Sequence, residues 1–322
     1  MRFQVPLDAA GMSLARFLER RMGLSRTYLR RLRTHGCITL DGREATLQAL
    51  LNGGEEVCLD VADTGRVEPE PIDLAIIYED EHLLVVDKPA GMVVHPVRDY
   101  RRGTLAAGVA HHLLRKGEPP VARPVQRLDR ETSGLILFAK HAAAAGRLAA
   151  ALERHKLDRH YLAIVAGRLE GDRGTVDVPI RRVWGHPVAR EVAVGPRPPE
   201  QEAALAEAAA RGQVLRGEWI GQRAVTHWEV LRRWGDRATW VRLRLETGRT
   251  HQIRVHMAYL GHPLLGDDLY GPGGPPGRQA LHAAALAFIH PFTGQLMRFT
   301  SPLPPDLRGL VDALDASEAA PQ

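Results

Sequence analysis

A polar loop at residues 125–134, Val-Gln-Arg-Leu-Asp-Arg-Glu-Thr-Ser-Gly, carries the side chains best suited to chemistry in this 322-residue chain. The loop leads into the apolar run 135–139, which the composition predicts to be a buried strand. Loops held by a rigid sheet often bear catalytic groups, so Asp129 is a candidate for a nucleophile. From its residue type alone, Asp129 could equally cap a turn.

A second polar stretch, Gly-Arg-Thr-His-Gln-Ile-Arg-Val-His at residues 248–256, could supply the cations that Asp129 would need. A partly buried carboxylate requires cationic partners if it is to stay ionised. The same stretch contains two histidines, His251 and His256, but without the HExxH or HxH spacing of a metal site.

Other familiar site motifs are absent from the sequence. There is no GxxxxGK[ST] phosphate loop, no GxGxxG after a strand and no GxSxG elbow. The two cysteines, Cys37 and Cys58, form no CxxC pair, which argues against a structural zinc site or a disulfide framework. We therefore expect no metal and no cofactor.

The elements that must position these groups mix strands and helices without a regular βαβ repeat. Alternating or continuous apolar residues predict strands at 74–78, 83–86, 135–139, 161–165 and 241–245, and helices at 141–154 and 250–260. This pattern favours an α+β fold with a mixed, largely antiparallel sheet. Residues 196–216 have the composition of an exposed insertion with a short helix.

The N-terminal segment is strongly basic. Residues 13–36 hold seven arginines against one glutamate, whereas the whole chain has a net charge of only +5. Their spacing predicts two short helices followed by a small β element that ends near residue 61. The candidate RNA-binding side chains here are Arg16, Arg20, Arg26, Arg30 and Arg33, although such a cluster can also be a solvated face.

Composition restricts the class of protein. Apolar residues make up 44% and charged residues 25%, as in globular proteins. No apolar run approaches a membrane span and the first residues lack a signal-peptide core, so we expect a cytoplasmic protein without a membrane partner. The polar, proline-containing stretch 62–72 predicts a linker, which gives three parts: 1–61, 62–72 and 73–322.

Five ordered segments resemble the RluA-like family of RNA pseudouridine synthases. They are LLVVDKPAGMVVHP, RLDRETSGLILFAK, RHYLAIVAG, LETGRTHQIRVHMAYLGHPLLGDDLYG and LHAAALAFIHP, together spanning about residues 74–307. The N-terminal pattern SLARFLERR-x-GLSRTYLRRLRTHGCITLDGR resembles the S4 RNA-binding domain, a small α/β module. The fold implied is thus a pseudouridine synthase catalytic domain preceded by an S4-like domain.

The resemblance implies a role for each matching residue. Asp129 matches the catalytic aspartate, and Tyr161 matches the tyrosine that packs against the target base and can act as a base. Arg254 matches the arginine that pairs with the aspartate, and Arg127 the arginine that holds the flipped nucleotide's place in the RNA. Gln126 and Arg159 depart from the family pattern, which more often has histidine and lysine at these positions.

The resulting prediction is a monomeric enzyme that isomerises uridine to pseudouridine in structured RNA, with large-subunit (23S) ribosomal RNA as the preferred substrate. A transfer RNA target is an alternative, since the same motifs serve both. Two further hypotheses from other classes are a non-catalytic RNA-binding or ribosome-assembly factor and a carboxylate-dependent hydrolase. An assay for pseudouridine after incubation with total RNA would separate them.

Overall fold

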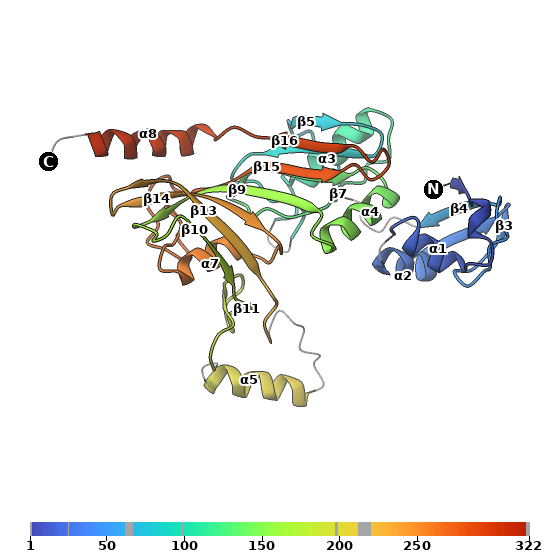
Figure 1. The fold of residues 1–322 in the computed structure, drawn as a ribbon, viewed down its shortest axis with the longest axis horizontal. Helices are drawn as coiled ribbons and strands as arrows, with labels where there is room; N and C mark the ends of the chain where they lie inside the picture. The colour runs from blue at the N-terminus through green and yellow to red at the C-terminus, as the bar shows by residue number, and fades with distance from the viewer. Residues whose placement is uncertain are drawn as a thin grey trace.

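The computed structural model describes residues 2–24, 26–61, 67–97, 100–196, 199–211 and 220–319. Two separate β-sheets form most of the fold (Figure 1). A four-stranded sheet belongs to the N-terminal unit, which we define as residues 2–61. A ten-stranded sheet belongs to the large unit, residues 67–319, and a two-stranded sheet projects from that unit.

In the N-terminal unit, two short helices pack on a sheet of order β1-β4-β2-β3. The side chain of Ser13 accepts a hydrogen bond from the backbone of Arg16 and so caps the first helix. Leucine, phenylalanine and tyrosine side chains at helical spacing form the buried faces, and the described helix arginines, Arg16, Arg20, Arg30 and Arg33, are exposed. The elements are β1 (Arg2–Gln4), η1 (Leu7–Ala9), α1 (Leu14–Arg20), α2 (Arg26–His35), β2 (Gly36–Leu40), β3 (Arg43–Glu44) and β4 (Glu56–Val61).

The large sheet has the order β10-β13-β14-β9-β15-β8-β6-β5, with β16 added beside β15 and β7 beside β8. Among the described strand pairs, only β15 and β8 run parallel, which confirms the predicted mixed, largely antiparallel α+β fold. The strands are β5 (Ala75–Glu79), β6 (Leu83–Lys88), β7 (Arg123–Pro124), β8 (Ser133–Ala139), β9 (Leu157–Ala166), β10 (Arg173–Asp177), β13 (Val225–Trp234), β14 (Ala238–Leu245), β15 (Leu281–Ile289) and β16 (Leu296–Thr300).

Helices cover both faces of this sheet where β6 and β8 lie. Successive residues of β8 alternate between two cores: Ile136 packs with the residues of α3, and Leu137 packs with those of α4. A strand buried on both faces reads as a continuous apolar run, which explains why LILF carries no polar residue. The helices of the large unit are α3 (Leu105–Arg115), α4 (Ala142–Glu153), α5 (Pro199–Ala210), α7 (Gln252–Tyr259) and α8 (Pro305–Ala319).

The two units touch at α4. Leu24 and Tyr28 of the N-terminal unit lie against Gly146, where an added Cβ would stand 3.4 Å from the Leu24 side chain. Of the expected linker, residues 62–66 lie outside the described residues. The remaining part packs on the large unit, because Val67 is buried in its core and the backbone of Glu70 bonds to α3.

The expected insertion consists mainly of α5, which Figure 1 shows at the end of a hairpin made of β11 (Ile180–Arg182) and β12 (Arg190–Val192). Its flanks, 197–198 and 212–219, lie outside the described residues. None of the helices that the structure describes combines the length and the apolar character that crossing a membrane requires.

Candidate active site

One pocket of about 570 Å³ lies against the central strands β14, β9 and β15 of the large sheet, and it collects the side chains singled out in the sequence. Asp129, Tyr161, Arg254 and Arg127 all line it, although they come from separate segments of the chain. Arg127 is exposed, whereas Tyr161 and Arg254 are only 5% and 6% exposed. The pocket therefore has a basic rim and a largely buried interior.

Lys88 fixes the loop that carries Asp129. Its ammonium group donates to the carbonyls of Pro89, Met92 and Arg130 at 2.8–2.9 Å, and its side chain is almost fully buried. Burial lowers the pKa of Lys88 to about 7, and the nearby carboxylates of Asp129 and Glu131 oppose that shift. Three acceptors match the three N–H groups of the protonated amine, so Lys88 ties the loop to the end of β6.

The other side of the loop is held by Arg278. Its guanidinium donates to the carbonyl of Glu131 at 2.9 Å and is anchored by Asp306 at 2.6 Å. The loop ends at Gly134, where φ is +111° and an added Cβ would lie 2.3 Å from the carbonyl oxygen of Ala283. Only glycine permits β8 and β15 to approach this closely.

Strand β9 brings Tyr161 and Arg159 to the pocket, because alternate residues of a strand face the same side. Burial raises the pKa of the Tyr161 phenol above its ordinary value; Arg159 opposes this shift and Asp129 adds to it. The hydroxyl is therefore protonated near neutral pH. The ring offers a flat apolar face and the hydroxyl can donate a hydrogen bond.

The two residues that depart from the family pattern also lie in this pocket. Gln126 and Arg159 are 6% and 5% exposed. Within the described part of the chain, the Gln126 Oε1 and Arg159 Nε atoms have no hydrogen-bond partner. Buried polar atoms of this kind usually find a partner, so a bound ligand is one way to satisfy them.

Helix α7 presents Arg254. The helix follows His251, whose backbone is left-handed with φ of 57°, and its first residue, Gln252, anchors it. The Gln252 side chain accepts from Thr247 Oγ1 at 2.8 Å and donates to the carbonyl of Val225 at 3.0 Å. These contacts fix where the first turn of α7, and hence Arg254, stands relative to the sheet.

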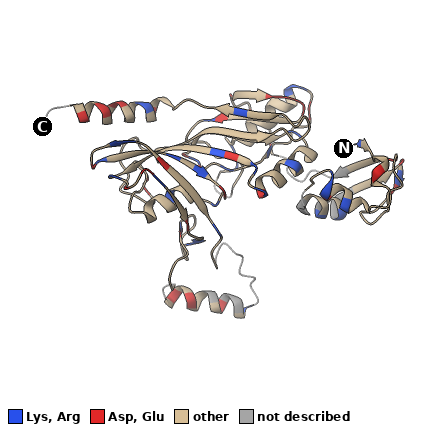
Figure 2. Ribbon diagram, viewed as in Figure 1, with Lys and Arg blue, Asp and Glu red and all other residues tan. Residues whose placement is uncertain are grey.

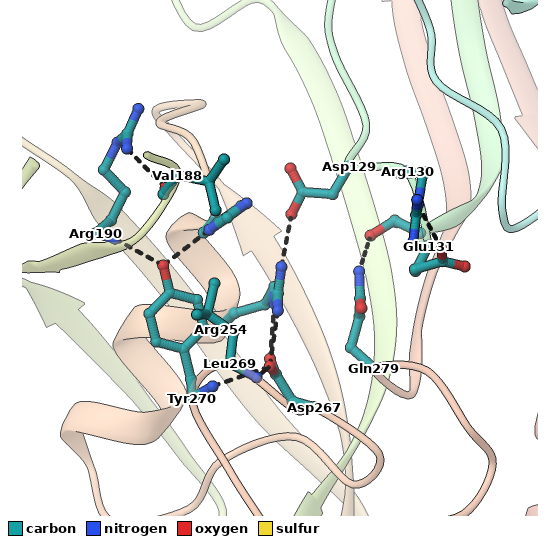
Figure 3. A network of polar contacts seen from close by, with 12 residues as sticks. Asp129, Arg130, Glu131, Val188, Arg190, Arg254, Asp267, Leu269, Tyr270 and Gln279 are labelled. Carbon is teal, nitrogen blue, oxygen red and sulfur yellow. Dashed lines mark hydrogen bonds and ion pairs between the residues drawn. The ribbon is translucent and has the colours of Figure 1, made fainter. Parts of the chain in front are cut away.

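Arg254 contacts Asp129, as the sequence predicts, but its closest partner is a second aspartate. The Arg254 Nη1 to Asp129 Oδ2 distance is 3.9 Å. The Nε and Nη2 atoms of Arg254 instead donate to the two carboxylate oxygens of Asp267, each at 2.7 Å (Figure 3). Asp267 lies in the matched segment GDDLYG, but no feature of the sequence distinguishes it from the neighbouring Asp268.

The Arg254–Asp267 pair changes the electrostatics of both groups. Burial alone would lower the pKa of Arg254, but hydrogen bonds and charge from Asp267, aided by Asp129, raise it. Burial likewise favours a higher pKa for Asp267, but the guanidinium and two backbone N–H groups bring it below its ordinary value. Both groups are therefore charged at neutral pH.

Tyr270 completes this network. Its ring lies 5.0 Å from the Arg254 guanidinium, and its hydroxyl accepts from the backbone N–H of Arg190 at 2.8 Å. The same hydroxyl lies 2.8 Å from His251 Nδ1, and burial lowers the pKa of that histidine. Tyr270 thus joins the pocket to strand β12 of the projecting hairpin (Figure 3).

None of the described arginines of the N-terminal unit lines this pocket, and Figure 1 shows α4 between the large sheet and helices α1 and α2. Arg16, Arg20, Arg30 and Arg33 are exposed on α1 and α2. Arg26 begins α2, but its side chain lies outside what is described. In the described ranges, no three His, Cys, Asp or Glu side chains gather as metal ligands would.

Comparison with known proteins points to one family. A family model described as RNA pseudouridylate synthase matches residues 82–259. A Bacillus subtilis relative, Uncharacterized RNA pseudouridine synthase YhcT, is 40% identical over 281 residues, covering 86% of this chain and 85% of the relative. Ribosomal large subunit pseudouridine synthase D of Nitrosomonas europaea is 37% identical over 324 residues, covering 96% and 86%.

A solved structure agrees with the sequence comparisons. The human protein RNA Pseudouridylate Synthase Domain Containing 1 superposes with a TM-score of 0.53 at 26% identity. The match covers 81% of this chain and 99% of the human chain.

Proposed function

The chain belongs to the RNA pseudouridylate synthase family, and from this premise we propose that Asp129, Tyr161 and Arg254 isomerise a uridine held in the pocket. The observation that carries the proposal is that these three residues, from distant segments, line one cavity. The Arg254 Nη1 atom stands 3.9 Å from the Asp129 carboxylate. Family membership makes the chain an RNA pseudouridine synthase; the roles of the individual residues are our proposal.

The reaction matches the chemistry of these side chains. Conversion of uridine to pseudouridine breaks the N1–C1′ bond and joins C5 to C1′, while C5 loses a proton and N1 gains one. One carboxylate can serve as the nucleophile, at ribose C1′ or at uracil C6, or it can promote elimination to a glycal. Asp129 is one-quarter exposed and faces the cavity, so it can reach a bound nucleotide.

The other lining residues bind and orient the base. The target uridine must leave the RNA stack, which costs a few kcal/mol, before it enters the pocket. We assign Tyr161 to contact with the uracil ring and, as a protonated phenol, to donation of a hydrogen bond. Gln126 and Arg159, with their unpaired buried atoms, are suited to contact the flipped nucleotide, and the exposed Arg127 to occupy the gap left in the RNA.

For the substrate, we propose large-subunit ribosomal RNA, on which several relatives are named to act. Residues 1–61 would act as an S4-like domain that binds phosphates through Arg16, Arg20, Arg26, Arg30 and Arg33. The catalytic domain would comprise residues 73–322, joined through the segment 62–72. We expect the protein to work as a monomer in the cytoplasm.

The test is an assay of pseudouridine in RNA incubated with the wild-type protein and with Asp129→Asn. We expect the variant to lose product formation by at least ~10³-fold while its affinity for RNA stays within about twofold. Asp172→Asn, which changes a residue that is 90% exposed at its side chain, is the matched control. Near-normal product formation by Asp129→Asn would refute the proposed mechanism.

The RNA target needs a separate experiment. Modified uridines can be mapped in ribosomal and transfer RNA from a strain that lacks the gene and from the same strain complemented with it. Loss of a site in large-subunit ribosomal RNA supports the proposed substrate. Loss confined to transfer RNA would overturn it, while leaving the isomerase activity intact.

A further inference from the structure

Asp267 binds the pocket residue Arg254 through two hydrogen bonds, yet it does not line the cavity itself. Its side chain is fully buried, and both of its oxygens accept hydrogen bonds from Arg254 at 2.7 Å. By comparison, the Arg254 to Asp129 contact of 3.9 Å is longer than a hydrogen bond. The main hydrogen bonds of Arg254 are therefore those to Asp267, which lies on the side of the guanidinium away from Asp129 (Figure 3).

The position of Asp267 is itself determined by its surroundings. One carboxylate oxygen also accepts from the backbone N–H groups of Leu269 and Tyr270, at 3.0 and 3.1 Å. Gly266, directly before it, has φ of +73°, and an added Cβ would lie 2.1 Å from the carbonyl oxygen of Arg278. The carboxylate is thus fixed by the backbone on one side and can orient a guanidinium on the other.

A guanidinium is planar, and its N–H groups point in fixed directions. The N–H groups that bind one partner therefore determine which N–H groups remain for another. Arg254 donates from Nε and Nη2 to Asp267, and the face of the same group lies over the Tyr270 ring. Only Nη1 remains directed at Asp129. Asp267 thus occupies the Nε–Nη2 edge, and the contact left to Asp129 is the single 3.9 Å approach of Nη1.

This arrangement suits a nucleophile. A carboxylate that attacks carbon must be ionised, but its lone pairs must be free of a tight bidentate ion pair. One cation at 3.9 Å provides the charge without occupying the oxygens. We propose that Asp267 is a positioning residue which binds Arg254 so that Asp129 keeps a cationic neighbour and yet remains free to react. The inference rests on the proposed role of Asp129.

The experiment compares Asp267→Asn, Asp267→Glu and Asp268→Asn with the wild type, on a ribosomal RNA fragment under single-turnover and steady-state conditions. Asp268 is the adjacent, exposed residue, so Asp268→Asn is a matched control and should behave as wild type. We expect kcat to fall ~10²-fold in Asp267→Asn, with KM and RNA affinity within about threefold, because the guanidinium can then turn toward Asp129.

Asp267→Glu distinguishes an effect of position from an effect of charge. Because it keeps a carboxylate opposite Arg254, it can also be measured if Asp267→Asn fails to fold. A side chain longer by one methylene keeps the negative charge but displaces the guanidinium, so we expect kcat to fall ~10-fold with KM unchanged. If Glu restores full kcat, or if folded Asp267→Asn keeps kcat within twofold of wild type, the proposal is wrong.

A double variant tests whether Asp267 acts through Arg254. Once Arg254 is replaced by leucine, the further change Asp267→Asn should lower kcat by less than about twofold. An additional ~10-fold decrease would show that Asp267 acts independently of Arg254 and would overturn the proposal. The proposed function fails on a different result, namely an inactive wild-type protein or an active Asp129→Asn variant.

Discussion

Arginine serves two different physical purposes in the two units of this protein. On α1 and α2 of the N-terminal unit, Arg16, Arg20 and Arg33 are exposed, and Figure 2 shows positive charge along both helices. In the pocket, Arg254 and Arg159 are 6% and 5% exposed and are bonded to protein oxygens. Arginine side chains are thus exposed to a binding partner in the N-terminal unit, whereas in the pocket they are buried and hydrogen-bonded within the protein.

The difference predicts different energetics. Exposed ion pairs such as Arg21–Asp8, whose side chains are 50% and 63% exposed, contribute about 0–1 kcal/mol to folding. Removing one member of a buried pair costs about 3–5 kcal/mol, because the other charge is left without a partner. The N-terminal arginines can therefore be changed without loss of the fold, and their effect should appear in RNA affinity. The pocket arginines should affect the rate and the stability.

The largest expected effect comes from Arg254→Leu. It leaves Asp267 buried without its cation and removes the positive neighbour of Asp129, so kcat should fall ~10³-fold and the free energy of unfolding by about 3 kcal/mol. Measurement of kcat by pseudouridine assay and of unfolding by denaturant titration would test both. Arg242→Leu, at a half-exposed arginine paired with Glu229, is the control and should change neither by much.

Arg254→Lys sharpens this test. Lysine keeps the charge but lacks the planar fork, so it cannot bind both oxygens of Asp267 while also facing Asp129. We expect stability to be partly restored and kcat to stay at least ~10-fold below wild type. Full activity in Arg254→Lys would mean that only the positive charge of residue 254 matters for the rate. Arg254 would then act through charge alone, as the exposed N-terminal arginines are expected to do.

The sequence predicted those parts of the site that depend on local pattern. Apolar runs and helical spacing located β8 and α4, which the structure confirms, and the ordered motifs brought attention to Asp129, Tyr161 and Arg254. The supporting contacts were not predictable, because they join residues distant in the chain: Lys88 bonds to the carbonyl of Arg130, 42 positions away. Asp267 and Asp268 are chemically identical neighbours, and nothing in the sequence shows that Asp267 is the buried one.

The next largest effect is expected at the exposed arginines. Replacing Arg16, Arg20, Arg30 and Arg33 by glutamine should weaken binding to a ribosomal RNA fragment ~10-fold or more at physiological salt, with kcat at saturating RNA unchanged. For every arginine–phosphate interaction that is removed, the log–log salt dependence of binding should flatten by ~0.7–0.9. Substitution is preferable to deletion of residues 1–61, because Leu24 and Tyr28 pack against α4.

The control removes the same charge from the large unit. Arg232, Arg242, Arg298 and Arg308 are exposed there and can be changed together to glutamine. If both quadruple variants lose affinity equally, the effect reflects net charge and the S4-like role of residues 1–61 is not supported. A change in kcat in the N-terminal variant would mean that the N-terminal unit affects the reaction rate as well as RNA affinity.

The smallest effect on catalysis is expected at a partly buried ion-pair network away from the pocket. Glu79 on β5 accepts from Lys140, Lys116 and His112 at 2.8–2.9 Å. Burial alone would raise the pKa of Glu79, but these three donors lower it to about 2. Because its folded-state pKa lies below that of the unfolded chain, Glu79 stabilises the fold above about pH 4.5, and this contribution is lost as pH falls toward 2.

Glu79→Gln should therefore lower the free energy of unfolding by about 2–3 kcal/mol at pH 7, with the difference from wild type shrinking between about pH 4.5 and pH 2. Since Glu79 does not line the pocket, kcat should stay within about twofold of wild type. Denaturant titrations across this pH range and a pseudouridine assay at neutral pH measure the two quantities. A loss of kcat comparable to that of Arg254→Leu would show that any buried ion pair supports the rate by holding the sheet together. An unchanged kcat would instead support the view that Arg254 affects the rate through its contact with Asp129 and not through the stability of the sheet.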